Sequence, residues 1–310
     1  MKNLIITSDV HKSFIVNMKN EGFHIDIRPE ISNAKLLECI SKYNGLVISS
    51  KIVVDDVLLE KATNLEFIGR LGSGMENINV ELAEKKGIHC FNSPEGNRNA
   101  VAEQAVGMLL SLLNNIHVAH AQMRDGLWLR EDNRGFELMG KTIGILGFGN
   151  TGQSFARKLQ GFDVDILAYD IKRIEQSFNY VTVVGLPAIF DEVDILSLHL
   201  PLDESTFHMV NSEFLNSFKN PIVVINTSRG QIIDTQCLIN AIEEKKVVGA
   251  VLDVFENEKL NSYSKIERKQ LNFLLNQPNI ICTPHIAGWT FEAREKMANY
   301  LYNKILETLK

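Results

Sequence analysis

Three polar residues with complementary chemistry each follow an apolar run in the second half of the sequence. They are Arg229 in NTSRG, Glu258 in LDVFENE and His285 in CTPHIAG. An arginine can bind a carboxylate and polarise a carbonyl, and a histidine can give or take a hydroxyl proton. A carboxylate beside the histidine stabilises its protonated form. Together the three residues supply what hydride transfer to a 2-keto acid requires.

Each of these residues also has a simpler explanation when taken alone. Arg229 is explained equally well by a surface charge, Glu258 by a loop acid and His285 by a capped histidine in a core. The set favours chemistry because all three follow predicted strands of one sheet, at the edge where open α/β sheets bind ligands. We therefore expect them to form one catalytic site.

A strand, a glycine-rich turn and a helix are predicted between Thr142 and Leu159. The apolar run 142–146 leads into three glycines spaced G-x-G-x-x-G, which are Gly147, Gly149 and Gly152. Glycine is needed because the turn requires backbone angles that a side chain resists, and because a pyrophosphate must approach the N–H groups of the helix N-terminus. Glycine triplets also occur in loops by chance, so the flanking strand and helix carry the prediction.

An acidic residue follows the next predicted strand. The run Val164 to Ala168 leads into Tyr169 and Asp170, and Asp170 comes 18 residues after Gly152. That spacing is close to the one expected for a carboxylate that accepts hydrogen bonds from both ribose hydroxyls of NAD. The same carboxylate would repel the 2′-phosphate of NADP. The sequence therefore predicts NAD as the cofactor.

The composition limits the class of protein. A length of 310 residues suggests about two domains, and a formal net charge of −6 argues against nucleic-acid and membrane-surface partners. The cysteines lack C-x-x-C spacing and are expected as reduced thiols: Cys39, Cys90, Cys237 and Cys282. His117 and His120 lack a third ligand nearby, so no metal site is expected. Without a membrane span or signal peptide, we expect a cytoplasmic protein.

Short apolar runs alternate with helical stretches along the chain, which predicts parallel sheets covered on both faces. The strands expected in a first unit are Leu4 to Ile6, Phe23 to Ile27, Leu46 to Ile48, Phe67 to Ile68 and Ile88 to Phe91. Its helices are expected at Phe14 to Glu21, Ala34 to Tyr43, Val57 to Ala62 and Val80 to Lys86. Beyond residues 142–146 and 164–168, the second unit's strands are expected at 181–184, 195–200, 222–226, 248–252 and 280–282.

The predicted fold class is α/β, with two doubly wound parallel-sheet domains joined by two crossovers. A flavodoxin-like substrate-binding domain is expected at residues 1–98 plus 286–310, and a Rossmann NAD-binding domain at residues 99–285. The apolar periodicity from Ala100 to Met123 predicts one long helix that joins the domains and packs outside its own unit, with a second subunit as one candidate partner. A closing helix, Phe291 to Leu309, should return to the first domain.

A loop with three glycines, Gly69 to Gly74, follows the fourth predicted strand. Backbone N–H groups of Ser73 and Gly74 could hold an anion there, because ligands bind at the carboxyl ends of parallel strands. A flexible connection is the alternative interpretation.

The sequence resembles the D-isomer-specific 2-hydroxyacid dehydrogenase family over essentially its whole length. Seven ordered segments carry the resemblance: GRLGSGMENIN (69–79), NSPEGNRNAVAEQAVGMLL (92–110), GILGFGNTG (144–152), HLPLDEST (199–206), INTSRGQIID (225–234), AVLDVFENE (250–258) and TPHIAG (283–288). The resemblance implies catalytic roles for Arg229, Glu258 and His285. It also implies that Asp253 meets the nicotinamide carboxamide and that Ser73 and Gly74 receive the substrate carboxylate.

The matching segments place further residues among the cofactor contacts: Asn150, Thr151, His199, Pro201, Thr206 and Thr227. The resemblance also implies a homodimer formed through the Ala100 to Met123 helix and its surroundings, and a small 2-hydroxy or 2-keto acid as the substrate.

Within the family the pattern is most similar to phosphoglycerate dehydrogenases, which implies 3-phosphoglycerate as substrate and a role in serine biosynthesis. Arg70 and Lys51 are the expected phosphate contacts, with Lys51 compensating for Ser49 where an arginine is frequent; Trp289 replaces a usually small residue. Because the sequence ends at Lys310, no serine-sensing regulatory domain is expected.

Three other functions compete with this one. A glyoxylate or hydroxypyruvate reductase would use the same three residues without a phosphate site. Formate dehydrogenase is disfavoured, because it carries glutamine where Glu258 stands. An NAD-sensing corepressor of the same fold would bind proteins without turning over a 2-hydroxy acid.

Overall fold

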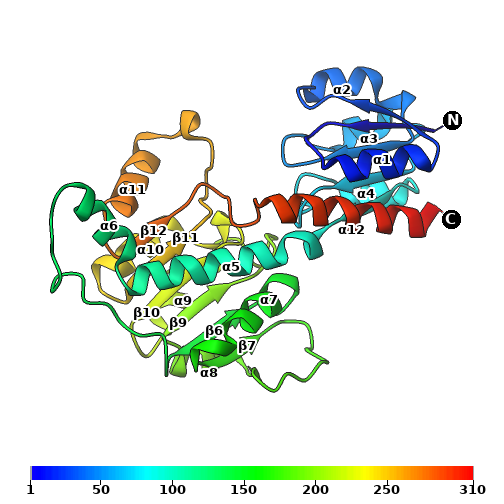
Figure 1. Cartoon of the computed structure of the whole chain (residues 1–310). Coiled ribbons are helices and arrows are strands. Elements are labelled where there is room, and N and C mark those ends of the chain that lie inside the picture. The colour runs from blue at the N-terminus through cyan, green and yellow to red at the C-terminus, as the bar shows by residue number, and fades with distance from the viewer. Residues whose placement is uncertain (1, 310) are drawn as a thin grey trace. The chain divides into compact units, whose positions relative to one another are not determined.

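The computed structural model describes residues 2–309 and contains two parallel β-sheets (Figure 1). The chain divides into two compact units, Met1–Asn99 with Gly288–Lys310, and Ala100–Ala287. The chain therefore passes twice between the units. The predicted fold class, two doubly wound parallel sheets, is confirmed.

The first unit is built on a five-stranded sheet in the order β2-β1-β3-β4-β5, which is the flavodoxin-like order. Its strands are β1 (Lys2–Ile6), β2 (Phe23–Ile27), β3 (Gly45–Ile48), β4 (Phe67–Arg70) and β5 (His89–Asn92). Its helices are α1 (Lys12–Asn20), α2 (Asn33–Cys39), the short 3₁₀ helix η1 (Ile40–Lys42), α3 (Asp56–Lys61), α4 (Val80–Lys85) and the C-terminal α12 (Phe291–Leu309).

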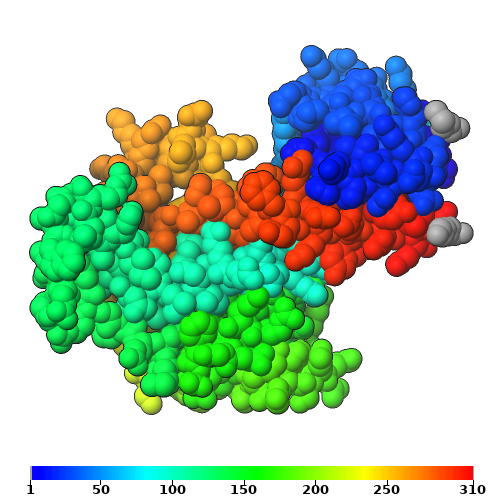
Figure 2. Space-filling model, in the orientation of Figure 1, coloured from blue at the N-terminus to red at the C-terminus, as the bar shows by residue number. Residues whose placement is uncertain are grey.

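Apolar side chains fill both faces of this first sheet. On one face α12 contributes Ala298, Leu301 and Ile305, which pack against Leu4 and Phe14 from the start of the chain. Figure 2 shows the red C-terminal helix against the blue N-terminal segments. The apolar periodicity of residues 291–309 thus serves to close one face of the first sheet.

The second unit is built on a seven-stranded parallel sheet in the order β12-β11-β10-β9-β6-β7-β8, a Rossmann order with one additional strand. Its strands are β6 (Thr142–Leu146), β7 (Asp165–Tyr169), β8 (Thr182–Val183), β9 (Ile195–Leu198), β10 (Ile222–Asn226), β11 (Val247–Leu252) and β12 (Ile280–Cys282). Its helical elements are α7 (Asn150–Leu159), η2 (Gln160–Phe162), α8 (Leu186–Glu192), α9 (Ser212–Asn216), η3 (Gly230–Ile232), α10 (Thr235–Glu243), η4 (Leu260–Ser262) and α11 (Lys265–Leu275).

The register of this sheet places the ends of its central strands at one edge. Leu146 of β6 pairs with Leu198 of β9, Leu198 pairs with Asn226 of β10, and Asn226 pairs with Leu252 of β11. The residue that follows each strand therefore lies at the same edge, because the strands are parallel. These following residues are Gly147, His199, Thr227 and Asp253.

The single long helix predicted from Ala100 to Met123 is wrong. Two helices are present, α5 (Pro94–Leu113) and α6 (Ile116–Arg124), and Asn115 between them has a φ of +52°. Asparagine tolerates this left-handed conformation and has a low helix propensity, so the Asn114-Asn115 pair ends the first helix. The helix also begins at Pro94, before the predicted start at Ala100, because proline suits the first helical position.

The packing of α5 also differs from the sequence prediction. Its residues Ala102, Ala105 and Leu109 are buried against the second sheet, in the same core as Phe155 and Leu159 of α7. The apolar face of the helix is therefore used largely within the second unit, whose sheet it helps to cover (Figure 1).

Candidate active site

The glycine-rich turn after β6 excludes side chains at two of its three glycines. Gly147 has a φ of +86°, and a Cβ there would lie 2.3 Å from the carbonyl oxygen of His199. A Cβ on Gly152 would lie 2.1 Å from the carbonyl oxygen of Gly147. A Cβ on Gly149 would meet no atom within 4 Å. The first and third glycines close the turn, and the second leaves open space.

The N-terminus of α7 adjoins that open space. Gly149 is its N-cap and provides no capping side chain, and Asn150 and Thr151 form the start of the first turn. The first backbone N–H groups of a helix have no partner within the helix and attract an anion. The predicted positions therefore form the kind of turn that binds a pyrophosphate.

Asp170 closes the turn from the end of the neighbouring strand. Its Oδ2 accepts a hydrogen bond of 2.7 Å from the N–H of Phe148, which lies between the first two glycines. Its Oδ1 accepts one of 2.8 Å from the N–H of Lys172. An ionised carboxylate has about four acceptor positions, so the side chain can still accept hydrogen bonds from ribose hydroxyls.

His199, which follows β9, is a buried neutral histidine. Burial lowers the pKa of its imidazole to about 3. Nε2 lies 2.8 Å from the hydroxyl of Ser197, whereas Nδ1 has no hydrogen-bond partner within residues 2–309. The hydroxyl of Thr227, which follows β10, is also buried without a partner in that part of the chain. Buried polar atoms are normally satisfied, so these two are candidates for contacts with a ligand.

Pro201 and Thr206 belong to one tight turn after β9. The hydroxyl of Thr206 donates to the carbonyl oxygen of Pro201 at 2.8 Å and accepts from the N–H of Asp203 at 2.9 Å. The turn is thus held by the protein's own hydrogen bonds. It lies at the strand edge that also carries Gly147 and Thr227.

The arrangement fits a dinucleotide. An uncapped helix N-terminus beside open space suits a pyrophosphate, Asp170 suits a ribose, and the partnerless atoms of His199 and Thr227 lie at the ends of the strands beyond. Bound NAD would supply the hydride acceptor at this edge. The assignment of each contact remains our prediction.

Asp253 is fully buried and holds the turn that carries His285. Its Oδ1 accepts hydrogen bonds from Gln104 Nε2 at 3.2 Å, from the hydroxyl of Thr283, and from the N–H of Ile286 at 2.9 Å. Its Oδ2 accepts the N–H of Ala287 at 2.8 Å. These four contacts match the acceptor capacity of a carboxylate. The structure thus gives Asp253 a positioning role, and the carboxamide contact implied by the resemblance stays an expectation.

His285 adopts a strained backbone conformation, with a φ of +55°. Its N–H donates to the carbonyl oxygens of Asp253 at 2.8 Å and Thr283 at 3.0 Å, which fixes the turn. A non-glycine residue held in the left-handed region costs about 1 to 3 kcal/mol and is typical of functional sites. The surroundings of His285 impose this conformation on it.

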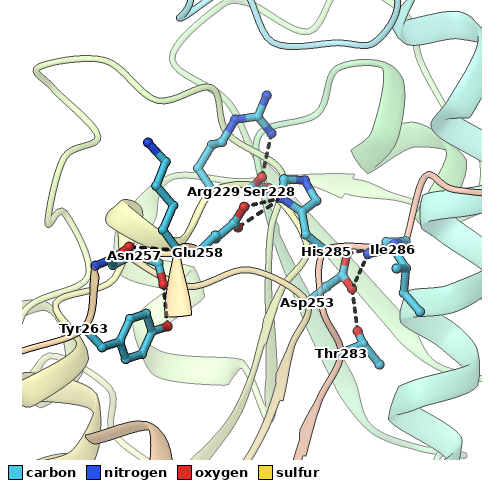
Figure 3. A network of polar contacts seen from close by, with 11 residues as sticks. Ser228, Arg229, Asp253, Asn257, Glu258, Tyr263, Thr283, His285 and Ile286 are labelled. Carbon is cyan, nitrogen blue, oxygen red and sulfur yellow. Dashed lines mark hydrogen bonds and ion pairs between the residues drawn. The ribbon is translucent and has the colours of Figure 1, made fainter. Parts of the chain in front are cut away.

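The three predicted catalytic residues come together at this edge (Figure 3). His285 Nδ1 lies 2.8 Å from Oε2 and 3.0 Å from Oε1 of Glu258. Burial would raise the pKa of the Glu258 carboxyl, but the hydrogen bond and charge of His285, the N–H of Phe255 and the charge of Arg229 outweigh it, and the net pKa is lowered. Arg229 Nη1 also donates to the carbonyl oxygen of Ser228 at 2.6 Å. An arginine, a carboxylate and a histidine thus form one electrostatically coupled cluster.

The four predicted substrate contacts lie in the first unit, where Arg70, Ser73 and Lys51 contact other groups of the protein. Arg70 lies against the glycine loop, donating to the carbonyl oxygen of Leu71, and a Cβ on Gly72 would lie 2.5 Å from its Nη1. Ser73 donates its hydroxyl to Asn97 Oδ1 at 3.0 Å. The predicted anion loop, which includes Gly74, is therefore braced by its neighbours.

Lys51 is engaged away from this loop. Its Nζ donates to the carbonyl oxygen of Pro29 at 3.0 Å and pairs with Glu30 at 3.2 Å, where the lysine side chain is half exposed. The charge that was expected to compensate for Ser49 is thus opposed by a carboxylate.

Two groups of residues at the site were missed by the sequence analysis. Gln104 and Thr283 hold Asp253, and Gln104 could have been noticed as a polar residue among the apolar residues of α5 that face the core. His208 and Glu256 form a second pair beside Glu258, and no local pattern distinguishes them from surface residues.

Across residues 2–309 no cluster of three or more histidine, cysteine, aspartate or glutamate residues could hold a metal ion. No helix in the described chain is long and apolar enough to span a membrane.

Comparison with known proteins identifies the class. Residues 106–287, more than half of the chain, match the family described as D-isomer specific 2-hydroxyacid dehydrogenase, NAD binding domain. The chain belongs to this family, and its cofactor is NAD. It is therefore an NAD-dependent oxidoreductase of the 2-hydroxyacid dehydrogenase class.

Several relatives are similar over most of the chain. A hydroxypyruvate reductase of Thermotoga maritima is 38% identical over 89% of this chain and 88% of the relative. A glyoxylate reductase of Pyrococcus furiosus is 34% identical over 94% of this chain and 88% of the relative. A D-3-phosphoglycerate dehydrogenase of Methanocaldococcus jannaschii is 32% identical over 100% of this chain, which spans only 58% of that relative.

Solved structures agree with the fold. A glyoxylate reductase from Paecilomyes thermophila has a TM-score of 0.88 at 25% identity, covering 100% of this chain and 95% of that chain. A D-2-hydroxyisocaproate dehydrogenase has a TM-score of 0.85 at 26% identity, covering 100% of this chain and 97% of that chain. Both likenesses extend over the two sheets.

Proposed function

We propose that the protein reduces a short 2-keto acid with NADH, with His285, Glu258 and Arg229 as catalytic residues. The observation that carries the proposal is the 2.8 Å contact between His285 Nδ1 and Glu258 Oε2, close to Arg229. The contact lies at the sheet edge that also carries the glycine-rich turn. NADH supplies the hydride to the carbonyl carbon. Protonated His285 supplies a proton to the carbonyl oxygen, and in the reverse direction neutral His285 accepts it.

The other residues hold the substrate and the histidine. Arg229 binds the substrate carboxylate and polarises the carbonyl, because its guanidinium can donate two parallel hydrogen bonds. Glu258 stabilises the protonated His285. In the first unit, the backbone N–H groups of Ser73 and Gly74 stay a predicted anion contact. Among residues 2–309, neither N–H donates to another group of the protein.

Hydroxypyruvate is the leading substrate candidate. The ion pair of Lys51 with Glu30 removes one of the two cations expected at a phosphate site. The relative most similar in both identity and length among those described above is named a hydroxypyruvate reductase. Glyoxylate, which lacks the hydroxymethyl group, would use the same catalytic residues.

3-Phosphohydroxypyruvate, paired with 3-phosphoglycerate in the reverse reaction, is the second candidate. Arg70 favours it, since its guanidinium lies against the Gly72 loop where a distal phosphate could be bound. The sequence favours this substrate, together with a role in serine biosynthesis. Relatives named D-3-phosphoglycerate dehydrogenase cover the whole of this chain but are considerably longer.

Initial rates of NADH oxidation with hydroxypyruvate, glyoxylate and 3-phosphohydroxypyruvate, measured side by side, test the proposal. We expect the highest kcat/KM for hydroxypyruvate. A higher value for the phosphorylated acid would favour the second candidate. Absence of turnover with all three would instead favour a corepressor-like NAD-binding protein.

We also propose that the protein is a homodimer, assembled through α6 and the segment that follows it. Large apolar side chains are exposed between residues 116 and 139, with Trp128 76% and Phe136 72% accessible. Exposed aromatic clusters of this kind are typical of protein interfaces, and a twofold dimer buries the same patch on both copies. Analytical ultracentrifugation should show that the native protein is a dimer. The double variant Trp128→Ser with Phe136→Ser should sediment as a monomer.

A further inference from the structure

A second histidine and carboxylate pair lies next to the proposed catalytic residues. Nε2 of His208 is 2.7 Å from Oε2 of Glu256, and its Nδ1 is 3.8 Å from Oδ2 of Asp234. His208 also has a φ of +48°, and its N–H donates to the carbonyl oxygen of Gln231 at 2.8 Å. The histidine is thus held in a conformation that such residues seldom adopt.

The Glu256 carboxylate joins three segments of the chain. Oε2 contacts His208 in the segment after β9, while Oε1 accepts the N–H of Thr235 at 2.8 Å, at the start of α10 after β10. Glu256 itself belongs to the segment after β11. One side chain therefore connects the three segments that follow neighbouring strands of the sheet.

Each of these segments carries a residue of the proposed site. Thr206 precedes His208 by two residues, and Glu258 follows Glu256 by two. Arg229 precedes Gly230, where a Cβ would lie only 1.9 Å from the carbonyl carbon of Phe255. Movement of Glu256 would therefore be transmitted to both the Arg229 turn and the Glu258 turn, because they are in direct backbone contact.

We propose that Glu256 and His208 are positioning residues that hold Arg229 and Glu258 in place for the reaction. Because the pair acts on the catalytic site described above, this proposal rests on the proposed function. Neither residue forms a hydrogen bond or ion pair with His285 among the described residues, and their role is to fix the segments on which the catalytic side chains stand. A displacement of about 1 Å in such a site can reduce turnover by about a hundredfold.

The chemistry of the pair suggests a test that distinguishes a positioning role from a purely structural contact. The groups facing the His208 ring are Glu256, Asp234 and the ring of Phe207, which stacks on it at 4.1 Å. In the native pair, His208 can donate from Nε2 whether it is protonated or neutral. The contact should therefore persist over the whole working pH range.

Glu256→Gln should make the contact depend on pH. With its oxygen toward Thr235 N–H, the amide turns its NH₂ group toward His208, which a neutral ring can accept and a protonated ring cannot. If the amide is turned around, its NH₂ group faces the N–H of Thr235 instead. Either orientation leaves two donors facing each other once His208 is protonated.

The experiment compares kcat with saturating NADH and keto acid at about pH 8.5 and about pH 5.5, on either side of the range where histidines titrate. We expect Glu256→Gln to be within about twofold of the native enzyme at the higher pH, and about tenfold slower at the lower pH. The double variant His208→Gln with Glu256→Gln has no imidazole ring at this position, so its ratio to the native enzyme should not change with pH.

The controls separate loss of positioning from loss of folding. Glu81→Gln removes an exposed ion pair with Lys85 on α4 and should match the native enzyme at both pH values. Thermal unfolding and NADH fluorescence titration should show a folded, cofactor-binding protein for each variant. If Glu256→Gln does not fold, His208→Ala should lower kcat about tenfold, and His208→Gln, which can still donate to Glu256, should restore it.

The outcomes are distinct from those that test the proposed function. Native enzyme without turnover on any keto acid would overturn the proposed function itself. Native turnover combined with an equal activity ratio of Glu256→Gln at both pH values would overturn the positioning role alone. A normal kcat in His208→Ala would also overturn it.

Discussion

His285 and Glu258 lie 27 residues apart in the sequence, and Nδ1 of the histidine is within 3.0 Å of both carboxylate oxygens. A histidine that donates Nδ1–H to a carboxylate has its tautomer and ring orientation fixed. Nε2 is then the nitrogen available to the substrate. This relationship gives each member of the pair a separate and measurable role.

His285→Ala should lower turnover by about 10² to 10⁴, as expected for loss of a general acid, while NADH binding persists. Alanine is strained at the left-handed φ of +55°, so His285→Asn is a matched variant, because asparagine tolerates that conformation. Both variants should lose turnover to a similar extent. A folded His285→Asn protein with normal turnover would show that the histidine only packs in the turn.

Glu258→Gln should move the alkaline limb of the reduction profile toward lower pH. Reduction requires protonated His285, and a neutral amide stabilises that form less than the carboxylate does. At the pH optimum the loss should be smaller than in His285→Ala. The measurement is kcat for reduction from about pH 5 to about pH 10. A profile that coincides with that of the native enzyme would remove the proposed coupling.

The same substitution should change the pH dependence of stability. The pKa of the Glu258 carboxyl is lowered in the folded protein, so its ionised form stabilises the fold above the unfolded pKa of about 4.3. That contribution is lost as the pH falls through the lowered folded pKa. Because the side chain is partly exposed, Glu258→Gln should lower Tm by only about 1 to 3 °C at neutral pH. The difference should shrink in acid, and a constant difference would contradict this reasoning.

The ends of β6, β10 and β11 could be predicted from the sequence, whereas contacts between distant side chains could not. Apolar runs fix where β6, β10 and β11 end, and parallel strands bring Gly147, Thr227 and Asp253 to one edge. The break at Asn115 was missed because the apolar periodicity continues across it. The pairing of Lys51 with Glu30 depends on tertiary structure, which no local pattern encodes.

The same limit applies to the residues that hold the catalytic turn. Gln104 and Asp253 are 149 positions apart in the sequence. Gln104 supports the turn through a hydrogen bond to the buried carboxylate of Asp253, which no local pattern reveals. The prediction of His285 and Glu258 as a pair needed only their chemical types and their places after strands. The structure supplies the buried network that imposes the backbone conformation of His285.

Asp170→Ala should narrow the preference for NADH over NADPH. The carboxylate is expected to accept the ribose hydroxyls and to repel a 2′-phosphate, so its removal should weaken NADH more than NADPH. Since Asp170 also accepts the N–H of Phe148, Asp170→Asn is a useful companion that keeps an acceptor for the turn. The test is kcat/KM with both cofactors. A native enzyme that uses them equally well would contradict the assignment.

Arg70 and Lys51 should differ in their effect on phosphorylated substrates. A charge-assisted contact is worth about 1.5 to 3 kcal/mol, so if Arg70 binds a distal phosphate, Arg70→Ala should raise KM for 3-phosphohydroxypyruvate about tenfold or more and leave hydroxypyruvate nearly unchanged. Lys51→Ala should change neither KM appreciably, because the lysine is already paired with Glu30. Equal losses on both substrates in Arg70→Ala would place the residue at the common carboxylate site or in the support of the Gly72 loop. A large, phosphate-specific loss in Lys51→Ala would show that the ion pair opens to receive the substrate.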